Sequence, residues 1–470
     1  MLVLVPSLAN FVRLAGVGGH QLLYHPASVA DIERDKDAQR RDRTLARLQT
    51  YSRLEGTPAS PLNTTGTSPN DACDNDILYS LECDAVHALV TEDREIHAKA
   101  KNRGLADRVY TIQTAEDWLK RLHEPLRVVL PNIEEEPLHA LTPVLSSAFF
   151  DSLRLGYQGF DDWFRRKARE NRMAWVYRDH QGELGAICIY ATQEDESIND
   201  LGERLQGTSL KLCTFKVGDS VRGRKIGELF LKAAFRYATK ANCEHIFIHA
   251  DAERHGYLVQ LLCEFGFVER GTYGSDVVLV KSHPTHAPAP NGIEPFEYLQ
   301  KYFPHYRRDA AVAKYVVPIQ PRFHEMLFPD YEPPQPRLFT DSGSIGNAIK
   351  LAYLCHAPVA AIKPGDLVLF YRTSDEKVIT SVGVVEKFAV LSDSAKVASL
   401  VSRRTVYSLE QIDAMAVRPT KVILFRLVEH FPKPVPLRAL EKQCSIAPPI
   451  QTIRKIADDS FEQILRIAGR

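Results

Sequence analysis

A short basic loop in the middle of the chain carries residue types that bind an anion. The segment VRGRKIG (221–227) holds Arg222, Gly223, Arg224, Lys225 and Gly227. Backbone N–H groups before a helix, together with the partial positive charge of a helix N-terminus, favour an anion such as pyrophosphate. Glycine lets a ligand approach the backbone closely, and the basic side chains add positive charge. An ordinary strand-to-helix turn with solvated basic side chains is the alternative interpretation.

The spacing within this loop excludes two common nucleotide sites. A Walker loop needs G-x-x-x-x-G-K-[ST], and a dinucleotide-binding fingerprint needs G-x-G-x-x-G. The segment 221–227 contains neither pattern. A nucleoside triphosphatase and a dinucleotide-dependent dehydrogenase are therefore disfavoured.

Regular elements surround the loop and must position it. The apolar run LKLCTFKV (210–217) predicts a buried strand before the loop, and ELFLKAAFRYATKANC (228–243) predicts an amphipathic helix after it. HIFIHAD (245–251) predicts a further strand, GYLVQLLCEFGF (256–267) a helix and SDVVLVK (275–281) a last strand. Upstream, AWVYRDHQGELGAICIYAT (174–192) has the pattern of a β-hairpin.

The loop and the order of these elements resemble the GNAT family of N-acetyltransferases over residues 125–281. That family carries [RQ]-x-x-G-x-[GA] before its long helix, and here Arg222 and Gly227 match while Lys225 stands where a glycine is usual. The resemblance implies that acetyl-CoA is the cosubstrate and that its acetyl group passes to an amine. It also implies a cofactor site formed by Phe215, Val217, Arg222, Gly223, Arg224, Lys225, Ile226 and Gly227.

The catalytic acid and base stay open at the level of sequence. Acetyl transfer needs a base for the amine proton and often an acid for the leaving thiolate. Many GNAT enzymes use a tyrosine four residues before the glycine of a Gly-Phe pair, and Leu262 occupies that position here. Tyr257, Tyr273 and His249 lie nearby in sequence, and each has a role in packing as its alternative.

The N-terminal part of the chain is rich in carboxylates that could converge. The pattern resembles a PIN nuclease domain over residues 1–122, which implies Mg²⁺ ligands at Asp31, Asp74, Asp76 and Asp93 for phosphodiester hydrolysis. The expected first strand, MLVLVPSLAN, lacks the aspartate that such domains carry. Either a strand precedes this sequence or the metal site is inactive. Helix capping is the alternative for Asp31 and Asp74.

The C-terminal part resembles a PUA-like barrel of the ASCH or EVE type over residues 312–470. A linker is expected at 282–311, a helix at GNAIKLAYLCHAP (346–358) and a strand at LVLFYR (367–372). The resemblance implies an RNA-binding face with Lys350, Tyr371 and Arg372, in which tyrosine stacks on a base and arginine holds a phosphate. Core packing of the tyrosine is the alternative.

Composition sets the outer limits of these interpretations. The 470 residues predict several domains, and the 59 basic side chains balance the 59 acidic ones. No apolar run reaches the length of about 20 residues that spans a bilayer, so we expect no membrane partner. The eight cysteines form no CxxC pair, which favours reduced thiols and a cytoplasmic protein.

We therefore expect a multidomain chain of α/β and α+β parts: a PIN-like α/β unit, a central GNAT domain with a mixed sheet, and a PUA-like β-barrel with helices. The expected function is an acetyl-CoA-dependent N-acetyltransferase that acts on or near an RNA, ribonucleoprotein or protein target. Two alternatives remain. One is a nucleic-acid-binding, toxin-like regulator whose GNAT domain senses CoA, and the other is a metal-dependent ribonuclease.

Overall fold

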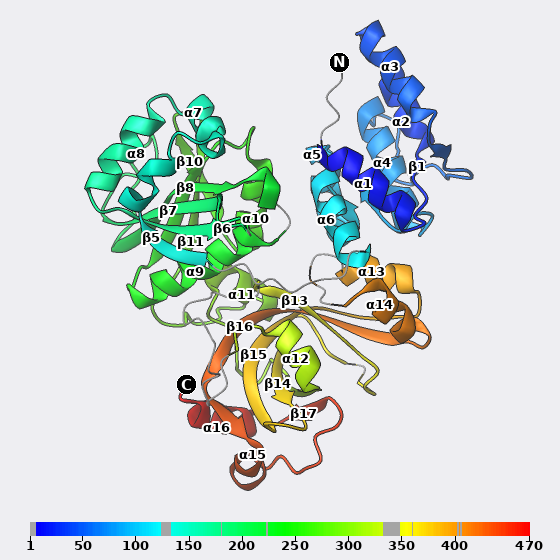
Figure 1. Ribbon diagram of the computed structural model, residues 1–470. Coiled ribbons are helices and arrows are strands. Elements are labelled where there is room, and N and C mark those ends of the chain that lie inside the picture. The colour runs from blue at the N-terminus through cyan, green and yellow to red at the C-terminus, as the bar shows by residue number, and fades with distance from the viewer. Residues whose placement is uncertain are drawn as a thin grey trace. The chain divides into compact units, whose positions relative to one another are not determined.

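The computed structural model describes residues 6–123, 133–179, 181–221, 224–331, 348–359, 361–401, 404 and 407–470. The chain divides into two compact units (Figure 1). The first combines residues 1–127 with 390–420, and the second combines 128–389 with 421–470. Within the described ranges, no helix has both the length and the apolar character needed to cross a bilayer.

The first unit is mainly helical. Its described N-terminal residues contain only two short parallel strand pairs, β1 (Leu23–Tyr24) with β2 (Ser52–Arg53) and β3 (Leu89–Val90) with β4 (Val109–Tyr110). Residues 6–123 thus show α/β alternation without the larger sheet of a PIN domain, and that assignment stays a prediction. The helices are α1 (Pro6–Val17), α2 (Pro26–Glu33), α3 (Ala38–Leu48), α4 (Pro69–Glu82), α5 (Arg94–Asn102), η1 (Ala106–Arg108) and α6 (Ile112–His123).

A late segment of the chain completes the first unit. Helices α13 (Ser394–Val401) and α14 (Leu409–Ala416) belong to it, although the sequence places them in the C-terminal domain. The hydroxyl of the fully buried Tyr110 lies 2.8 Å from the carbonyl oxygen of Ser399, and Lys396 pairs with Asp84 at 2.5 Å. A buried hydrogen bond and an ion pair therefore join segments that are far apart in sequence.

The second unit contains a seven-stranded sheet in the order β10-β11-β9-β8-β7-β6-β5. All neighbouring strands are antiparallel except β8 and β9, which are parallel. The strands are β5 (Ile133–Pro137), β6 (Met173–Arg178), β7 (Leu184–Glu194), β8 (Thr208–Val217), β9 (His245–Ala250), β10 (Val268–Tyr273) and β11 (Asp276–Ser282). The predicted strands at 210–217, 245–251 and 275–281 and the predicted hairpin are confirmed.

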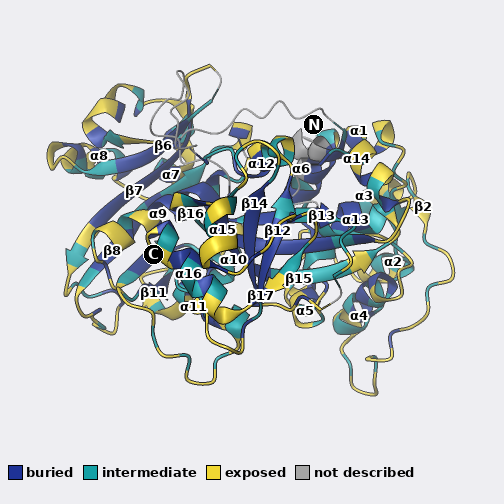
Figure 2. Ribbon diagram, turned by 90° about the horizontal axis from the view of Figure 1, so that it is seen from below, coloured by how far each residue is buried: buried dark blue, intermediate teal, exposed yellow. Residues whose placement is uncertain are grey.

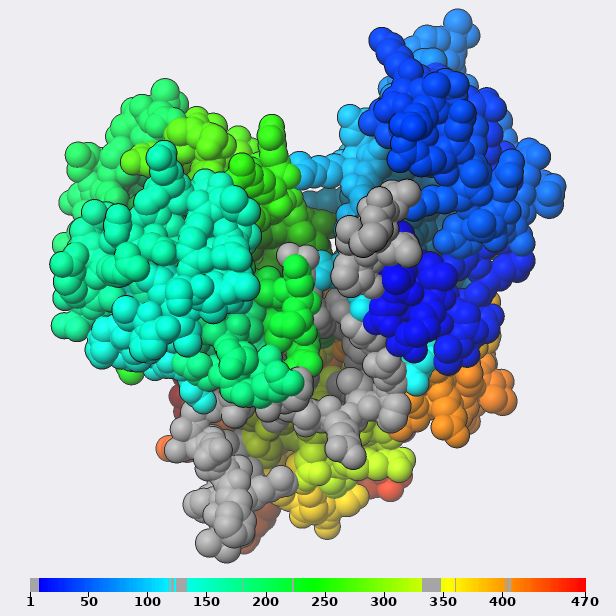
Figure 3. All heavy atoms as spheres, turned by 45° about the horizontal axis from the view of Figure 1, so that its top comes forward, coloured from blue at the N-terminus to red at the C-terminus, as the bar shows by residue number. Residues whose placement is uncertain are grey.

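Helices cover both faces of this sheet (Figure 1). On one face Phe164 packs with Ile187 and Ile189, and on the other Phe230 packs with Leu212. Apolar side chains of the strands point to both faces of the sheet and pack against the helices on each face, as expected for a sheet that is buried on two sides. This part of the unit is the closely packed cyan and green body of Figure 3. The helices are η2 (Leu138–Val144), η3 (Ala148–Phe150), α7 (Asp151–Gly156), α8 (Phe160–Arg169), η4 (Asp219–Val221), α9 (Ile226–Lys240) and α10 (Gly256–Glu264).

A six-stranded sheet in the order β13-β16-β15-β14-β12-β17 forms the rest of the second unit. Its order has two ends, and the described residues do not show the expected closure into a barrel. β12 and β14 are parallel, and every residue of β14 is buried (dark blue in Figure 2). The strands are β12 (Lys314–Ile319), β13 (Lys350–Cys355), β14 (Leu367–Arg372), β15 (Val378–Leu391), β16 (Thr420–Pro436) and β17 (Arg454–Ile456).

Two local predictions for this region are wrong. The segment expected to be a helix at 346–358 contains strand β13, which pairs with β16 from Lys350 to Cys355. The expected linker at 282–311 contains helix α11 (Pro295–Tyr302), whose Tyr298 and Leu299 are buried. In both cases, packing against distant parts of the chain decides the structure. The remaining helices are α12 (Pro321–Leu327), α15 (Leu437–Gln443) and α16 (Asp458–Ala468).

Candidate functional site

The two parallel strands of the seven-stranded sheet separate at one end. β8 pairs with β9 only between residues 209–212 and 245–248. Beyond Leu212, β8 continues to Val217 on the side of β7, while β9 continues to Ala250 on the side of β11. In the described structure, residues 213–217 therefore have no pairing with β9. The two strands separate along this stretch, which is where an extended ligand with amide groups would pair with β8.

The N-terminus of α9 lies directly after this separation. Its N-cap residue, Lys225, has φ of 57° and ψ of 23°, which is the left-handed conformation. Few residues other than glycine adopt this conformation, because Cβ approaches the backbone. The structure thus gives a physical reason for the glycine that the GNAT pattern carries at this position. A Cβ on Gly227 would lie 3.1 Å from Leu261 Cδ2, so this glycine allows close packing of α9 on α10.

The other expected cofactor residues lie around the same helix start. Phe215 packs edge-to-face on Phe230 with ring centroids 5.5 Å apart, and Val217 pairs with Ala186 of β7. Ile226 is buried, and the Arg224 guanidinium donates to the Tyr177 hydroxyl at 2.9 Å. Arg222 and Gly223, which were also expected here, lie outside the described residues.

The Lys225 side chain has a defined partner. Its ammonium donates to the carbonyl oxygen of Lys350, on strand β13, at 3.1 Å. The N–H of Lys350 donates to Glu228 Oε1 at 2.6 Å, and the ammonium of Lys350 pairs with Glu264. Lys350 was expected on an RNA-binding face, but the structure places it in this junction between β13 and the helices α9 and α10.

The other two expected RNA contacts are buried. Tyr371 and Arg372 are each only 4% exposed. The Arg372 guanidinium pairs with Asp375 at 2.5 Å and with Glu325 at 3.0 Å. The hydrogen bond to Asp375 raises the pKa of Arg372 above its usual range. A buried ring offers no face for a base, and these carboxylates already neutralise the arginine. The structure therefore assigns both side chains to the core.

Sequence reasoning missed a group of titratable side chains at the carboxyl end of β9. Val277 pairs with Ala250, so the next residues along the two strands, Asp276 and Asp251, lie side by side. The hydroxyl of Tyr157 lies beside the Asp276 carboxyl and interacts with it. Burial, and then the charge of Asp251, raise the pKa of Asp276. Burial and the neighbouring Asp276 and Asp251 raise the pKa of Tyr157 to about 12.

The catalytic candidates considered from sequence lie in other surroundings. His249 Nε2 is 2.9 Å from the Ile198 carbonyl oxygen, and its ring stacks on Tyr273 with centroids 4.7 Å apart. Burial lowers the pKa of His249. Tyr257 is 58% exposed, and Leu262 is fully buried. In the sequence, Asp251 at the end of HIFIHAD and Asp276 at the start of DVVLVK could have indicated this group. No local sequence pattern connects either aspartate with Tyr157.

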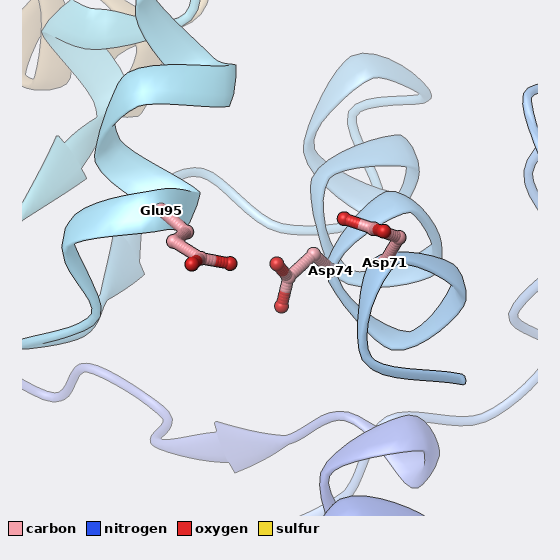
Figure 4. A group of neighbouring side chains, drawn as sticks. All are labelled: Asp71, Asp74 and Glu95. Atoms are coloured by element: carbon pink, nitrogen blue, oxygen red, sulfur yellow. The ribbon is translucent and has the colours of Figure 1, made fainter. Parts of the chain in front are cut away.

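In the first unit, one group of carboxylates has the spacing of metal ligands. Oxygen atoms of Asp71, Asp74 and Glu95 lie within 4.8 Å of one another (Figure 4), and they are the only such group among the described residues. The Lys99 ammonium donates to Asp71 at 2.6 Å and to Asp74 at 2.7 Å. Since this ammonium already occupies the position between the two aspartates, the donor set as it stands does not fit Mg²⁺.

The other three expected metal ligands have structural partners. Asp31 pairs with Arg34 at 2.7 Å. Asp76 accepts the N–H of Ser60 at 2.7 Å, and Asp93 caps α5 by accepting the N–H of Glu95 at 2.8 Å. The expected convergence of Asp31, Asp74, Asp76 and Asp93 is therefore not observed. The capping interpretation holds for Asp93, a residue for which it was not considered.

Comparison with known proteins gives partial similarities. No family model and no curated protein matches the chain. Among solved structures, ASCH from Zymomonas mobilis is 13% identical over 33% of this chain and 94% of that chain, with a TM-score of 0.26. NAA60 from Arabidopsis thaliana in complex with acetyl-CoA is 16% identical over 32% of this chain and 99% of that chain, with a TM-score of 0.25.

A third similar structure is the PaiA N-acetyltransferase from Thermoplasma acidophilum in complex with coenzyme A. It is 15% identical over 32% of this chain and 99% of that chain, with a TM-score of 0.24. Parts of the chain are thus similar to solved N-acetyltransferases and to an ASCH structure. Similarities at this level support no conclusion about activity, so the function is inferred below from the geometry of the chain itself.

Proposed function

We propose that the seven-stranded sheet and its helices form an acetyl-CoA-dependent N-acetyltransferase. The separation of β8 from β9 beside the N-terminus of α9 is the observation that carries this proposal. In the described part of the sheet, β8 no longer pairs with β9 beyond Leu212, and this separation suits the amide groups of the pantetheine arm. The first N–H groups of α9 suit the pyrophosphate, because helix N-termini attract anions.

The acceptor amine approaches the thioester at the carboxyl end of β9 in this proposal. There the amine nitrogen attacks the thioester carbonyl, a C–N bond forms and the C–S bond breaks. Asp276 accepts the proton that the amine loses, and the departing CoA thiolate takes a proton from water. A carboxyl group whose pKa is raised by burial and by Asp251 is a better base than an ordinary aspartate. Tyr157 lies beside this carboxyl group and interacts with it.

The acceptor is proposed to lie on or near an RNA, ribonucleoprotein or protein target. Tyr371 and Arg372 are buried, so the recognition of such a target falls to other surfaces. The first alternative is a nucleic-acid-binding regulator in which this domain only senses CoA. Such a regulator would have the same cofactor site but would transfer no acetyl group. The ribonuclease alternative has little support, because Lys99 pairs with two of the three clustered carboxylates.

Calorimetry with acetyl-CoA on the full chain tests the cofactor site. We expect binding that Arg222→Glu weakens about tenfold or more, because a carboxylate would repel the pyrophosphate. Arg166→Glu, an equal charge change on the exposed side of α8, is the matched control. A wild-type chain that does not bind acetyl-CoA, or a loss that is equal in both variants, contradicts the proposal.

Mass spectrometry of RNA and protein from expressing cells then tests transfer. The enzyme should add new acetyl groups to one of these fractions, and Asp276→Asn should strongly reduce their amount. Binding of acetyl-CoA without any new acetyl group would instead favour the CoA sensor.

A further inference from the structure

Three polar groups from the acetyltransferase part hold one residue of the six-stranded sheet. The ammonium of Lys225 donates to the carbonyl oxygen of Lys350. The Glu228 carboxylate accepts the N–H of Lys350, and the Glu264 carboxylate pairs with the Lys350 ammonium. Lys225 is the N-cap residue of α9 and Glu228 lies in its first turn, which is where the proposed pyrophosphate site lies. Strand β13 is therefore bonded to the element that binds the cofactor.

The junction is partly buried, with the Lys350 side chain 12% exposed and Glu264 30% exposed. Glu228 is 7% exposed, and the two residues before Lys350, Ala348 and Ile349, are 2% and 1% exposed. Buried polar groups depend strongly on their partners, because water cannot replace a lost hydrogen bond. The bonds to Lys350 therefore restrain the first turn of α9 more firmly than the same bonds would at a surface.

The backbone at Lys225 needs such a restraint. A lysine in the left-handed conformation is intrinsically unfavourable, and the neighbouring contacts must hold it there. The bond from its ammonium to Lys350 supplies one of these contacts. The direction of the first N–H groups of α9 then depends on strand β13 as well as on the helix.

We propose that Lys225 and Glu228, through Lys350, are positioning residues that hold the N-terminus of α9 in the geometry that binds the pyrophosphate of acetyl-CoA. This inference rests on the proposed function. It makes strand β13, which lies outside the acetyltransferase sheet, a required part of the cofactor site. None of the three residues needs to touch the phosphates.

Substitutions at Glu228 separate positioning from simple electrostatics. Glu228→Met and Glu228→Gln both remove a negative charge near the phosphates, but only glutamine keeps an oxygen that accepts the Lys350 N–H. On charge alone, both variants should bind acetyl-CoA more tightly. We expect Glu228→Met to bind it about fivefold or more weakly than Glu228→Gln, since the hydrogen bond is lost.

Substitutions at Lys225 provide the second comparison. Lys225→Met should weaken acetyl-CoA binding to a similar degree, and Lys225→Arg should restore it by supplying a donor. Lys240→Met, at the other end of α9, is the matched control. Affinity is measured by calorimetry, with thermal unfolding to show that each variant is folded.

The ligand lacking the pyrophosphate provides the decisive readout. Acetyl-pantetheine has the thioester and the arm but no phosphate, so its affinity should be the same in Glu228→Met and in Glu228→Gln. If Glu228→Met weakened the binding of acetyl-CoA and of acetyl-pantetheine equally, the residue would have a general structural role and the proposal would be overturned. Equal affinity of Glu228→Met and Glu228→Gln for acetyl-CoA would overturn it as well. Failure of the wild-type chain to bind acetyl-CoA would instead contradict the proposed function.

Discussion

Asp330 forms a buried ion pair whose removal should destabilise the second unit strongly. Its carboxylate is 3% exposed and accepts hydrogen bonds from Lys232 of α9 at 2.7 Å and from His430 of β16 at 3.1 Å. Burial alone would raise the pKa of Asp330. The hydrogen bond from His430 and the charge of Lys232 outweigh burial and hold this pKa well below its usual range.

The size of the effect follows from what Asp330→Asn leaves behind. The Lys232 side chain is only 10% exposed, so its ammonium would lose its carboxylate partner without gaining water. Removing one partner of a buried pair lowers the free energy of unfolding by about 3–5 kcal/mol. Replacing both partners by apolar residues of similar size is often close to neutral. Asp330→Leu combined with Lys232→Met should therefore recover much of the loss.

Urea denaturation of wild type, Asp330→Asn and the double variant measures the effect. The difference between wild type and Asp330→Asn should be fully present above the ordinary aspartate pKa of about 4. It should decrease as the pH falls below that value, because the native pKa is the lower one and the unfolded state then binds more protons. A loss below about 1 kcal/mol, typical of an exposed pair, would refute the reasoning. A double variant less stable than Asp330→Asn would refute it as well.

Three further predictions concern other titratable groups. Burial lowers the pKa of Lys281 to about 7. Between pH 7 and 10 the unfolded state therefore binds a proton that the native state does not, and the unfolding free energy of wild type, relative to that of Lys281→Met, should rise by roughly 1 kcal/mol per pH unit. Asp276→Asn should lower kcat about a hundredfold and leave the Kd for acetyl-CoA unchanged, in steady-state kinetics and calorimetry; an unchanged kcat would exclude it as the base. Millimolar Mg²⁺ should not shift the Tm of the wild-type chain, but it should raise the Tm of Lys99→Met, whose carboxylates lose their ammonium; a shift in the wild type would restore the metal-site hypothesis.

Local patterns predicted the elements around the basic loop well. The strand, loop, helix and strand from 210 to 251 are contiguous, and each has a clear apolar period. A short-range signal is sufficient for such features, because the residues that define them are neighbours in sequence.

Long-range pairing explains what the sequence could not predict. The apolar run in GNAIKLAYLC suits either a helix or a strand, and only its partner β16, more than 60 residues later, makes it a strand. The same limit applies to Asp276, Asp251 and Tyr157, which come from three separate elements. The burial of Tyr371 depends likewise on the layers packed around β14, which its own strand does not encode.

The late position of residues 390–420 has a consequence for synthesis. These residues complete the first unit through contacts such as that of Ser399 with Tyr110. A ribosome that adds about 5–20 residues per second needs roughly 15–60 s to travel from residue 127 to residue 420. During that interval the N-terminal segment exposes the surface that α13 later covers. We therefore expect a nascent chain arrested before residue 390 to be more sensitive to protease within residues 1–127 than the completed chain.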